Sequence, residues 1–466
     1  MVRLYNSLSR TIEEFIPLKP PKVGMYTCGM TVYDYAHIGH GRKYVGDDIL
    51  RRTLTRFGFD VKHVQNVTDV GHLVSDADIG EDKLEKGAKK QGKTVWEVAE
   101  RFTKHFYDSM DKLNILRPTV ICKATDHIPE QIALVQTLME KGFAYDTPEA
   151  VYFDVAKFPK YGTLFGNQEL SEKKTAAREE VQTGEHKKNP ADFALWFKRV
   201  GRFADHAMHW ESPWGDGFPG WHIECSAMSM KYLGESFDIH TGGIDHIPVH
   251  HPNEIAQSEA ATGKPFSKYW IHYAFLNVDG KKMSKSLGNY YTIEDIVKKG
   301  FDPLALRYFY LTAHYRKPLN FTWEALTAAQ NALSELRSHA SRTSLSNEKL
   351  EKIDVYRDKF DTALQNDLNT PQALAVVWEM MKSNIPARDK YDLLMDFDEV
   401  LGLHLGKNFE SKAIPEEIEK LITSREQLRK EKKFAEADAV RKQIELKGYR
   451  VEDSVAGVQV TLQVRS

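Results

Sequence analysis

Apolar and polar positions near the start of the chain follow a strand–helix–strand order. Residues 23–32 (VGMYTCGMTV) and 60–70 (DVKHVQNVTDV) are apolar runs of the length that buried strands have. Between them, residues 41–58 have the spacing of an amphipathic helix that ends at Gly58. A helix between two such strands predicts a βαβ unit and therefore a parallel sheet.

The pattern changes several times after this unit. Residues 76–115 are charged and predict helices, whereas residues 120–215 are irregular and predict an insertion into the same fold. Within the insertion, residues 171–192 are polar and predict a mobile loop. Parallel-sheet character resumes at residues 236–245.

The chain becomes helical after residue 300. Residues 302–311, 322–341 and 370–381 have helical periodicity and predict a bundle. In the last of these helices Thr370 is the expected N-cap, with proline as the first helical residue. Residues 415–466 predict a helical hairpin followed by a short β-rich end.

The sequence thus predicts an α/β fold: a Rossmann-type parallel-sheet catalytic domain with an insertion, followed by a helical bundle and a small mixed α/β C-terminal module. The expected ranges are 1–120 and 216–300 for the two halves of the catalytic domain, 121–215 for the insertion, 301–410 for the helical domain and 411–466 for the C-terminal module.

Composition narrows the class of protein. A chain of 466 residues with 41% hydrophobic and 28% charged residues is typical of a globular enzyme of two to four domains. The net charge of −2 excludes an overall basic field, although a local basic patch remains compatible with it. Three widely spaced cysteines do not suggest a disulfide framework, so we expect a reducing, cytoplasmic setting. The first residues lack the apolar core of a signal peptide, and no stretch has the roughly 20 apolar residues that span a bilayer.

Two short motifs carry candidate phosphate chemistry. The first is HIGH, residues 37–40, where a strand passes into a helix; backbone N–H groups and the helix N-terminus are expected to face an anion there, with His37 and His40 as further donors. The second is KKMSKSLGN, residues 281–289, a cationic loop whose Lys282 and Lys285 are expected to close over a triphosphate. Either motif alone also fits an ordinary turn or a solvated loop.

A candidate metal site combines residues from distant parts of the chain. His250 and Glu254 are one helical turn apart and can address one point, and Cys28 and Cys225 can supply thiolates. Two thiolates, an imidazole and a carboxylate suit Zn²⁺. The alternative is that both cysteines are packed as small apolar side chains.

HIGH and KMSKS together resemble the paired signatures of class I aminoacyl-tRNA synthetases, and both match without substitution. Longer stretches, among them CGMTVYDYAHIGHGR and FDIHTGGIDHIPVHHPNEIAQ, resemble cysteinyl-tRNA synthetases from about residue 3 to 330 and more loosely to the end. The resemblance implies one zinc ion per chain in the amino-acid pocket, held by Cys28, Cys225, His250 and Glu254. His251 is not part of the matched set, and Cys122 is expected to be a packed thiol.

The resemblance also implies the remaining roles. The expected ATP-binding residues are His37, Gly39, His40, Asp245 at the ribose, Lys282 and Lys285, and the expected cysteine-binding residues are Thr31, Thr68, Trp221 and His240. Of these, His37, His40, Lys282 and Lys285 are the expected catalytic residues, and Trp221 has packing as its alternative role. The implied partners are ATP with Mg²⁺, L-cysteine and tRNA-Cys, with a monomer as the expected state.

Zinc would explain how cysteine is separated from serine. A purely steric pocket discriminates between such isosteres by only about 1–3 kcal/mol, whereas a thiol ionises readily on zinc and an alcohol does not. Our hypothesis is that substrate cysteine joins the metal as a further ligand and that Glu254 moves aside. An editing domain is then not needed.

The chain departs from the family pattern at two positions. Met30 stands where the family usually has proline, and near Gln459 and Val460 the usual tryptophan is absent, which puts anticodon stacking by this end in doubt. A basic cluster between Arg425 and Lys433 is still expected to bind tRNA, unless it is simply a solvated helix face. Two alternatives stay open: a cysteine:amino-sugar ligase with the same adenylate chemistry, and a non-catalytic RNA-binding paralogue with a structural zinc.

Overall fold

The computed structural model describes residues 1–70, 73–75, 79–165, 186–284, 287–344, 354–406, 416–447, 449–454 and 457–462. Most of the predicted mobile loop, residues 171–185, therefore lies outside the described residues, and so does Lys285. Within the described ranges, no helix combines the length and the apolar character needed to cross a membrane.

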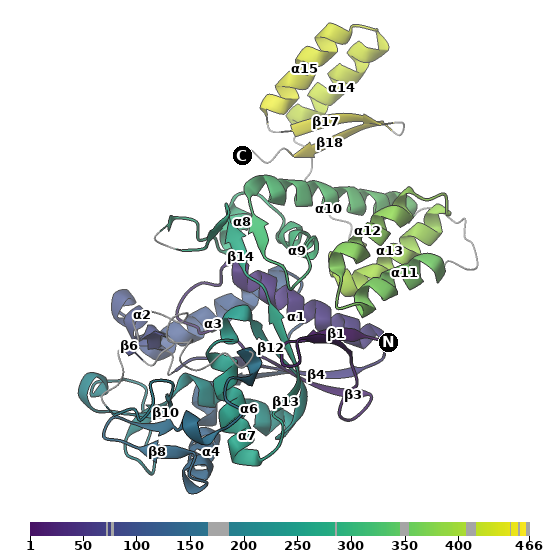
Figure 1. The fold of residues 1–466 in the computed structure, drawn as a ribbon. Coiled ribbons are helices and arrows are strands. Elements are labelled where there is room, and N and C mark those ends of the chain that lie inside the picture. Colours follow the sequence, from purple (N-terminus) through teal and green to yellow (C-terminus); the bar gives the residue numbers. More distant parts are fainter. Residues whose placement is uncertain are drawn as a thin grey trace.

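A five-stranded parallel sheet forms the centre of the molecule (Figure 1). Its order is β13-β12-β3-β4-β7, and the strands are β3 Lys22–Thr27, β4 Asp60–Val67, β7 Val120–Lys123, β12 Phe237–Gly243 and β13 Ser267–Tyr273. The strand order reverses between β3 and β12, which are neighbours although far apart in sequence. In open α/β sheets the crevice at the carboxyl ends of two such strands is the usual ligand site.

Helices cover both faces of this sheet. Val23 and Met25 of β3 belong to one apolar cluster with Leu50 and Leu54 of α1, whereas Tyr26 belongs to the other large cluster with residues of α6. Successive side chains of a strand point to opposite faces, so α1 and α6 lie on opposite sides. The helices of this region are α1 Ile38–Arg56, α2 Lys83–Gln91, α3 Val95–Lys112, α4 Ile128–Glu140, α6 Trp221–Leu233 and α7 His250–Thr262.

The region expected to be irregular contains a second sheet. Its antiparallel order is β11-β10-β9-β8, from β8 Ala144–Asp146, β9 Ala150–Phe153, β10 Phe193–Lys198 and β11 Gly217–Pro219. Stacked rings of Phe153 and Phe193 pack its centre. Two short hairpins complete the N-terminal half: β1 Arg3–Asn6 with β2 Thr11–Glu14, and β5 Leu73–Ser75 with β6 Ile79–Asp82. The predicted helical stretch from residue 76 thus begins with a strand.

A small three-stranded sheet carries the second phosphate motif. β14 Leu276–Val278 pairs with β15 Lys281–Lys282 and with β16 Leu319–Phe321. Between β14 and β15, Asp279 and Gly280 both have positive φ, 49° and 73°. This is the backbone of a two-residue type I′ turn, for which Asp-Gly is a favoured pair.

The segment after residue 300 is helical, as predicted. Its helices are α8 Ile293–Lys298, α9 Pro303–Leu311, α10 Trp323–Thr343, α11 Asp354–Gln365, α12 Thr370–Lys382 and α13 Ala387–Leu401. The predicted cap of α12 is wrong by one residue: the Asn369 side chain accepts a hydrogen bond from the Gln372 N–H, and Thr370 is already helical.

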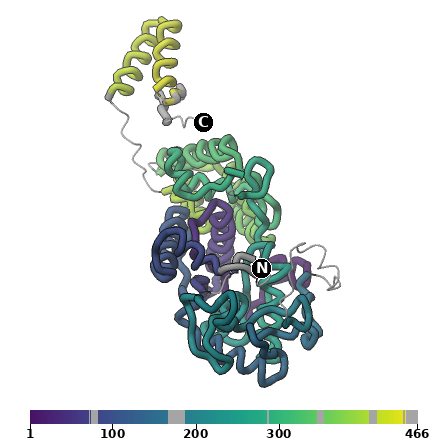
Figure 2. The backbone as a smooth tube through the Cα atoms, turned by 90° about the vertical axis from the view of Figure 1, so that its left-hand side faces the viewer, coloured from purple at the N-terminus to yellow at the C-terminus, as the bar shows by residue number. Residues whose placement is uncertain are grey.

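The C-terminal unit consists of α14 Glu416–Lys430, α15 Phe434–Leu446, β17 Tyr449–Ser454 and β18 Gly457–Leu462. It lies beyond α10, at the end of the molecule away from the insertion (Figures 1 and 2). Ile418, Ile444 and Val451 form its core. Arg425, expected to belong to an exposed basic cluster, is buried within this unit, which leaves the exposed part of the cluster at residues 429–433.

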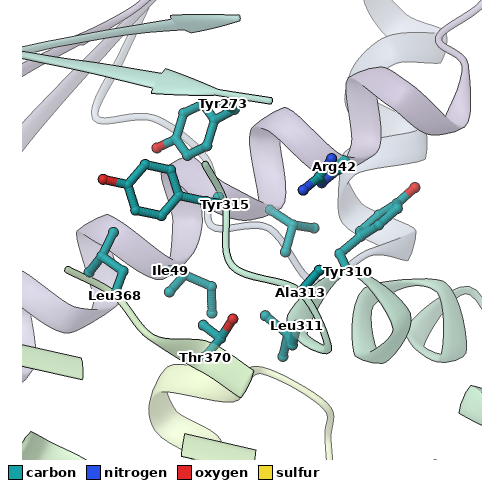
Figure 3. Close-up of a pocket in the computed structure, with 11 residues that line it drawn as sticks. Arg42, Ile49, Tyr273, Tyr310, Leu311, Ala313, Tyr315, Leu368 and Thr370 are labelled. Atoms are coloured by element: carbon teal, nitrogen blue, oxygen red, sulfur yellow. The ribbon is translucent and has the colours of Figure 1, made fainter. Parts of the chain in front are cut away.

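Arg42 links α1 to both segments that flank the small sheet. Its buried guanidinium donates to the carbonyls of Ala274 and Phe275, before β14, and to those of His314 and Lys317, before β16. Figure 3 shows Arg42 above a pocket bordered by tyrosine rings and by the turn that leads into α12. Arg42 therefore fixes the base of the β14–β15 hairpin relative to the helix that begins with HIGH.

A second buried arginine joins the catalytic domain to the bundle. Arg307 of α9 forms a fully buried ion pair with Asp48 of α1 (2.6 Å) and donates to the Leu401 carbonyl of α13 (2.6 Å). Loss of Arg307 removes the fully buried partner of Asp48, which keeps only the ion pair with Arg52 (2.7 Å), and it also leaves the Leu401 carbonyl without this donor. Arg307→Met is therefore expected to lower the free energy of unfolding by about 3–5 kcal/mol, measured by urea denaturation. The matched control is Lys104→Met, which removes an exposed ion pair with Asp108; an equal loss in both variants would contradict the assignment.

Candidate active site and metal centre

The HIGH turn is built as a reciprocal cap of α1. The Nδ1 atom of His37 accepts hydrogen bonds from the N–H groups of Gly39 (3.0 Å) and His40 (3.3 Å), and the Nδ1 atom of His40 accepts from the His37 N–H (3.3 Å). The two imidazole rings stack with their centroids 3.6 Å apart. Histidines thus take the part that serine and glutamate take in an ordinary capping box.

This cap corrects one expectation from the sequence. The N–H groups of Gly39 and His40 were expected to face an anion, but they bond to His37, while the Ile38 N–H bonds to the Tyr291 carbonyl. Because each Nδ1 accepts, the ring proton of each neutral imidazole lies on Nε2. Burial lowers the pKa of His40 well below its usual value, so His40 is a neutral donor. In this structure the backbone N–H groups of Gly39 and His40 are therefore already engaged by the cap.

Asn289 closes the base of the KMSKS loop. Its Oδ1 accepts from the Ser284 N–H (2.8 Å), and its Nδ2 donates to the Lys282 carbonyl (3.2 Å). Both histidines and Lys282 line one cavity of about 540 Å³, together with Met283 and Ser284. Pockets of 300–1,000 Å³ are usual for small-molecule ligands. The structure therefore brings HIGH and the described part of KMSKS to one cavity.

Gly39 permits the close approach of these two motifs. A Cβ atom at this position would lie 2.6 Å from the Met283 methyl carbon and 2.9 Å from the His37 ring. Gly39→Ala should therefore displace the loop or the imidazole. Since a shift of about 1 Å in a catalytic group costs up to about 100-fold in rate, we expect a loss of 10- to 100-fold in ATP–pyrophosphate exchange, with little change in melting temperature. Gly87→Ala is the control, inside α2, where a Cβ atom would meet only ordinary contacts at 3.5 Å and 3.9 Å; similar activity in Gly39→Ala and in that control would contradict the prediction.

The predicted metal residues converge at the carboxyl end of the central strands. Cys28 directly follows β3, Cys225 lies in α6, and His250 and Glu254 occupy the first turns of α7. One ligand atom from each of the four residues lies within 4.8 Å of the other three, and all four residues are buried. The carboxylate of Glu254 is 3.0 Å from His250 Nε2 and 3.8 Å from Cys28 Sγ.

Local packing explains why Cys28 is followed by glycine. A Cβ atom at Gly29 would lie 1.6 Å from the Asn66 carbonyl oxygen, so only glycine fits beside β4. The Gly29 N–H donates to the Asn66 side chain at 2.7 Å. The Cys28 carbonyl in turn accepts from Lys43 Nζ (2.7 Å) and from the Tyr44 hydroxyl (3.3 Å) on α1. The helix that begins with HIGH therefore also positions the thiol.

Burial and mutual contacts shift the pKa values of all four side chains. Burial opposes ionisation of Cys225, but hydrogen bonds from Cys28 and His250 lower its pKa to about 6. Burial likewise disfavours the imidazolium of His250, yet the Glu254 carboxylate raises its pKa to about 10. Burial raises the pKa of Cys28 well above its usual value. Despite burial, His240 and His250 hold the pKa of Glu254 well below its usual range. These shifts favour a thiolate at Cys225 and a carboxylate at Glu254.

Further histidines surround the predicted set: His251 was left out of the predicted ligand set, and His222 and His272 were not identified from the sequence. Six of the 18 histidines fall between residues 222 and 272, and this density is the signal that was available. His222 Nδ1 contacts His250 Nδ1 (2.9 Å), while His250 Nε2 lies 3.0 Å from the Glu254 carboxylate inside the cluster. His251 Nδ1 contacts His272 Nε2 (2.8 Å), and His251 Nε2 lies 3.4 Å from Cys28 Sγ. Burial lowers the pKa of both His251 and His272 well below the usual value, so these rings are neutral.

A second grouping of possible ligands shares Cys28 and Glu254 with the first. It replaces Cys225 and His250 by His240 and His251. His240 Nε2 is 2.8 Å from Glu254 Oε2, so the carboxylate bridges the two groupings. The first grouping contains two sulfur ligands and the second only one, which matters for the choice of metal.

The expected substrate residues divide into two sets. Thr31, Trp221 and Asp245 line the cavity. Thr68 and His240 are buried and are not among its lining residues: Thr68 accepts a hydrogen bond from the Asn66 side chain (3.0 Å), and His240 lies behind Glu254. The Trp221 ring stacks on His250, with centroids 4.1 Å apart, so it connects the cavity to the metal residues.

Comparison with known proteins identifies the class of this site. Residues 14–331 match the family described as tRNA synthetases class I (C) catalytic domain, and residues 359–385 match the DALR domain. Among solved structures, a methionyl-tRNA synthetase from Mycobacterium tuberculosis covers 82% of this chain and 88% of its own at 16% identity and a TM-score of 0.56. A leucyl-tRNA synthetase from Agrobacterium radiobacter, crystallised with tRNA, covers 84% of each chain at 12% identity and a TM-score of 0.60. These two likenesses concern the fold.

Sequence relatives are more specific. A cysteine–tRNA ligase from Burkholderia lata is 47% identical over 97% of this chain and 95% of its own length, and one from Treponema denticola is 45% identical over 97% and 98%. With the central sheet, the HIGH turn and the catalytic-domain match, these relatives show that the chain belongs to the cysteine–tRNA ligases of the class I aminoacyl-tRNA synthetases.

Proposed function

We propose that this protein activates L-cysteine with ATP and transfers the cysteinyl group to the 3′ end of tRNA-Cys. The observation that carries the proposal is the buried cluster of Cys28, Cys225, His250 and Glu254 beside a cavity that HIGH and KMSKS share. In the first step a carboxylate oxygen of cysteine attacks the α-phosphorus of ATP, and the bond from that phosphorus to the pyrophosphate oxygen breaks. In the second step a ribose hydroxyl of the tRNA attacks the carbonyl carbon, and AMP leaves.

The residues of the cluster fit Zn²⁺. Its donor atoms are two sulfurs, one imidazole nitrogen and one carboxylate oxygen, a set typical of zinc and not of Mg²⁺ or Ca²⁺. The contact between His222 and His250 orients the imidazole, as outer partners of zinc-binding histidines do. We assign the ion to the grouping with two thiols because it offers two soft sulfur donors; hydrogen bonds that lower the pKa of Cys225 to about 6 favour the same choice. A zinc ion held there would supply a soft Lewis acid that favours a thiolate over an alcohol.

The phosphate groups of ATP are assigned to the histidines of HIGH and to the KMSKS lysines. Nε2–H of His37 and of His40 donates to oxygens on which charge develops, and Lys282 offsets that charge. Lys285 keeps the same proposed role from its motif, although it lies outside the described residues. Asp245 lines the cavity, and we assign its carboxylate as the acceptor of hydrogen bonds from the ribose hydroxyls. Mg²⁺ is expected to arrive with ATP.

The cysteine pocket is assigned to the side of the cavity next to the metal cluster. Thr31 and Trp221 line it and are proposed to contact the substrate directly. Thr68 and His240 do not line the cavity, and they are proposed to act indirectly. Thr68 is paired with Thr31 in an isolated β-bridge and positions it, and His240 acts through its hydrogen bond to Glu254. A cytoplasmic, monomeric enzyme remains part of the proposal.

The decisive test of the reaction is cysteine-dependent exchange of labelled pyrophosphate into ATP, followed by charging of tRNA-Cys. We expect both activities from the purified protein. Exchange without charging, together with transfer of cysteine to an amino sugar, would instead establish the cysteine:amino-sugar ligase. Absence of exchange with saturating cysteine and ATP would contradict the proposed function and would favour the non-catalytic paralogue.

Metal binding should release protons in a pattern set by the cluster. A bound thiolate and a neutral imidazole are required. At about pH 8, Cys225 is already ionised, whereas Cys28 and His250 still carry protons. At that pH, addition of Zn²⁺ to the chelator-treated protein should release about two protons. Near pH 5, where Cys225 is protonated as well, it should release about three. The affinity for Zn²⁺ should therefore rise with pH. Calorimetry in buffers of different ionisation enthalpy measures this number. Release of no protons at about pH 8 would contradict the ligand assignment.

A further inference from the structure

The acidic and the basic side chains of α2 have different surroundings. Its acidic residues are engaged with the protein: Asp82 caps the helix through the Leu84 N–H (2.7 Å), and Glu85 accepts from the Ala207 N–H of the insertion (2.5 Å). Its lysines Lys86, Lys89 and Lys90 are all exposed. The exposed face of α2 is therefore basic in a chain whose net charge is −2.

These lysines differ from many other exposed lysines of the chain. Lys104, Lys264 and Lys359, for example, each lie 2.5–2.6 Å from a carboxylate oxygen. Among the residues that the structure describes, no carboxylate lies within ion-pair distance of Lys86, Lys89 or Lys90. A basic face without counter-charges is available to a polyanion.

The basic face begins at the mouth of the active-site cavity. Tyr33 and Lys83 both line the cavity, and Lys83 is the first residue of α2. Lys83, Lys86 and Lys90 are spaced by three and four residues, so they form one stripe that leads away from the cavity over about 10 Å. Beyond α2, the Trp96 indole is 49% exposed and contacts Trp210 edge to face.

We propose that this face, Lys86, Lys89 and Lys90 with Trp96, binds the single-stranded 3′ end of the tRNA and guides it into the cavity. The inference rests on the proposed function, because it describes how tRNA, the second substrate of the proposed reaction, reaches the cavity. Proteins bind single-stranded nucleic acids with positive charge along the path of the sugar–phosphate backbone and with exposed aromatic rings on which bases stack. The acceptor end must reach the cavity for the ribose hydroxyl to attack, and α2 borders its mouth.

The test is the triple variant Lys86→Gln, Lys89→Gln, Lys90→Gln in the full-length protein. We expect its Kd for tRNA-Cys to rise about tenfold and the slope of log Kd against log salt to fall by about 2. ATP–pyrophosphate exchange should stay unchanged, because it needs no tRNA. The wild-type protein and the triple variant should bind equally well to tRNA that lacks its single-stranded 3′ end, which locates the contact. Trp96→Ala should raise the KM for intact tRNA without changing the salt slope.

Two controls make the result decisive. Lys19, Lys22 and Lys268 lie near the amino ends of the parallel strands, at the opposite edge of the sheet, and their triple glutamine variant should bind tRNA as the wild type does. The triple variant Lys86→Arg, Lys89→Arg, Lys90→Arg should bind tRNA as the wild type does, because it keeps the charge. Unchanged affinity and salt slope in the glutamine variant, or an equal loss in the control, would overturn the proposal. Absence of exchange in the wild type would instead refute the proposed function itself.

Discussion

Cys28→Ser is expected to lower cysteine-dependent pyrophosphate exchange by at least about 100-fold and to remove most of the bound zinc. The Cys28 side chain is common to both groupings of possible ligands, and it is the only member of the assigned set that lines the cavity. Serine preserves the size of the side chain but does not ionise, so the soft ligand is lost. Loss even of an outer partner of a metal ligand typically costs 10- to 100-fold, and loss of the ligand should cost more.

Cys122→Ser is the matched control for this experiment. Cys122 is also buried, at 3% exposure, but its Sγ contacts the Gln65 carbonyl on β4 and it belongs to neither ligand grouping. A serine hydroxyl can donate to the same carbonyl, so zinc content and exchange should be retained. Full zinc content in Cys28→Ser, or equal losses in the two variants, would contradict the assignment.

His40→Asn is expected to lower kcat for exchange by about 100- to 1,000-fold with little change in the KM for ATP or in melting temperature. The side-chain oxygen of asparagine can replace Nδ1 as the acceptor for the His37 N–H, so the helix cap is kept. The Nε2–H donor, which is proposed to act on charge that develops only in the transition state, is lost.

His40→Ala separates the two roles of this residue. It removes both the cap and the donor, so its kcat should fall as far as that of His40→Asn while its melting temperature falls as well. Rates are followed by exchange of labelled pyrophosphate, and melting by calorimetry. An unchanged kcat in His40→Asn would show that the imidazole serves the helix cap alone.

Much of the fold and of the site could be predicted from the sequence because the signals are local. The strand–helix–strand order and the helical segment after residue 300 follow from periodicity, and the structure and the comparisons confirm the fold class. The second sheet was not predicted because its strands, such as β8 and β9, are only three or four residues long and give little alternation. Arg425 was misplaced because charge alone does not reveal which face of a helix is buried.

The HIGH motif shows a second kind of feature that the sequence did not predict. HIGH was recognised, but its backbone N–H groups were expected to bind the anion because serine and threonine are the usual caps and histidine is not. The convergence of Cys28 with Cys225 depends on β3 lying next to β12, and strand order cannot be read from periodicity. The family resemblance supplied that information. Roles of individual residues and the domain boundaries stay predictions.

The most direct test of the account is the absorption spectrum of the protein with Co²⁺ in place of Zn²⁺. We predict one metal ion per chain and sulfur-to-cobalt charge-transfer bands whose intensity per bound Co²⁺ falls by about half in Cys28→Ser and in Cys225→Ser but not in Cys122→Ser. Addition of cysteine should strengthen these bands, and addition of serine should leave them unchanged. A fully active protein without bound metal, or bands that respond equally to cysteine and serine, would contradict the claim that these four residues select the substrate by its sulfur.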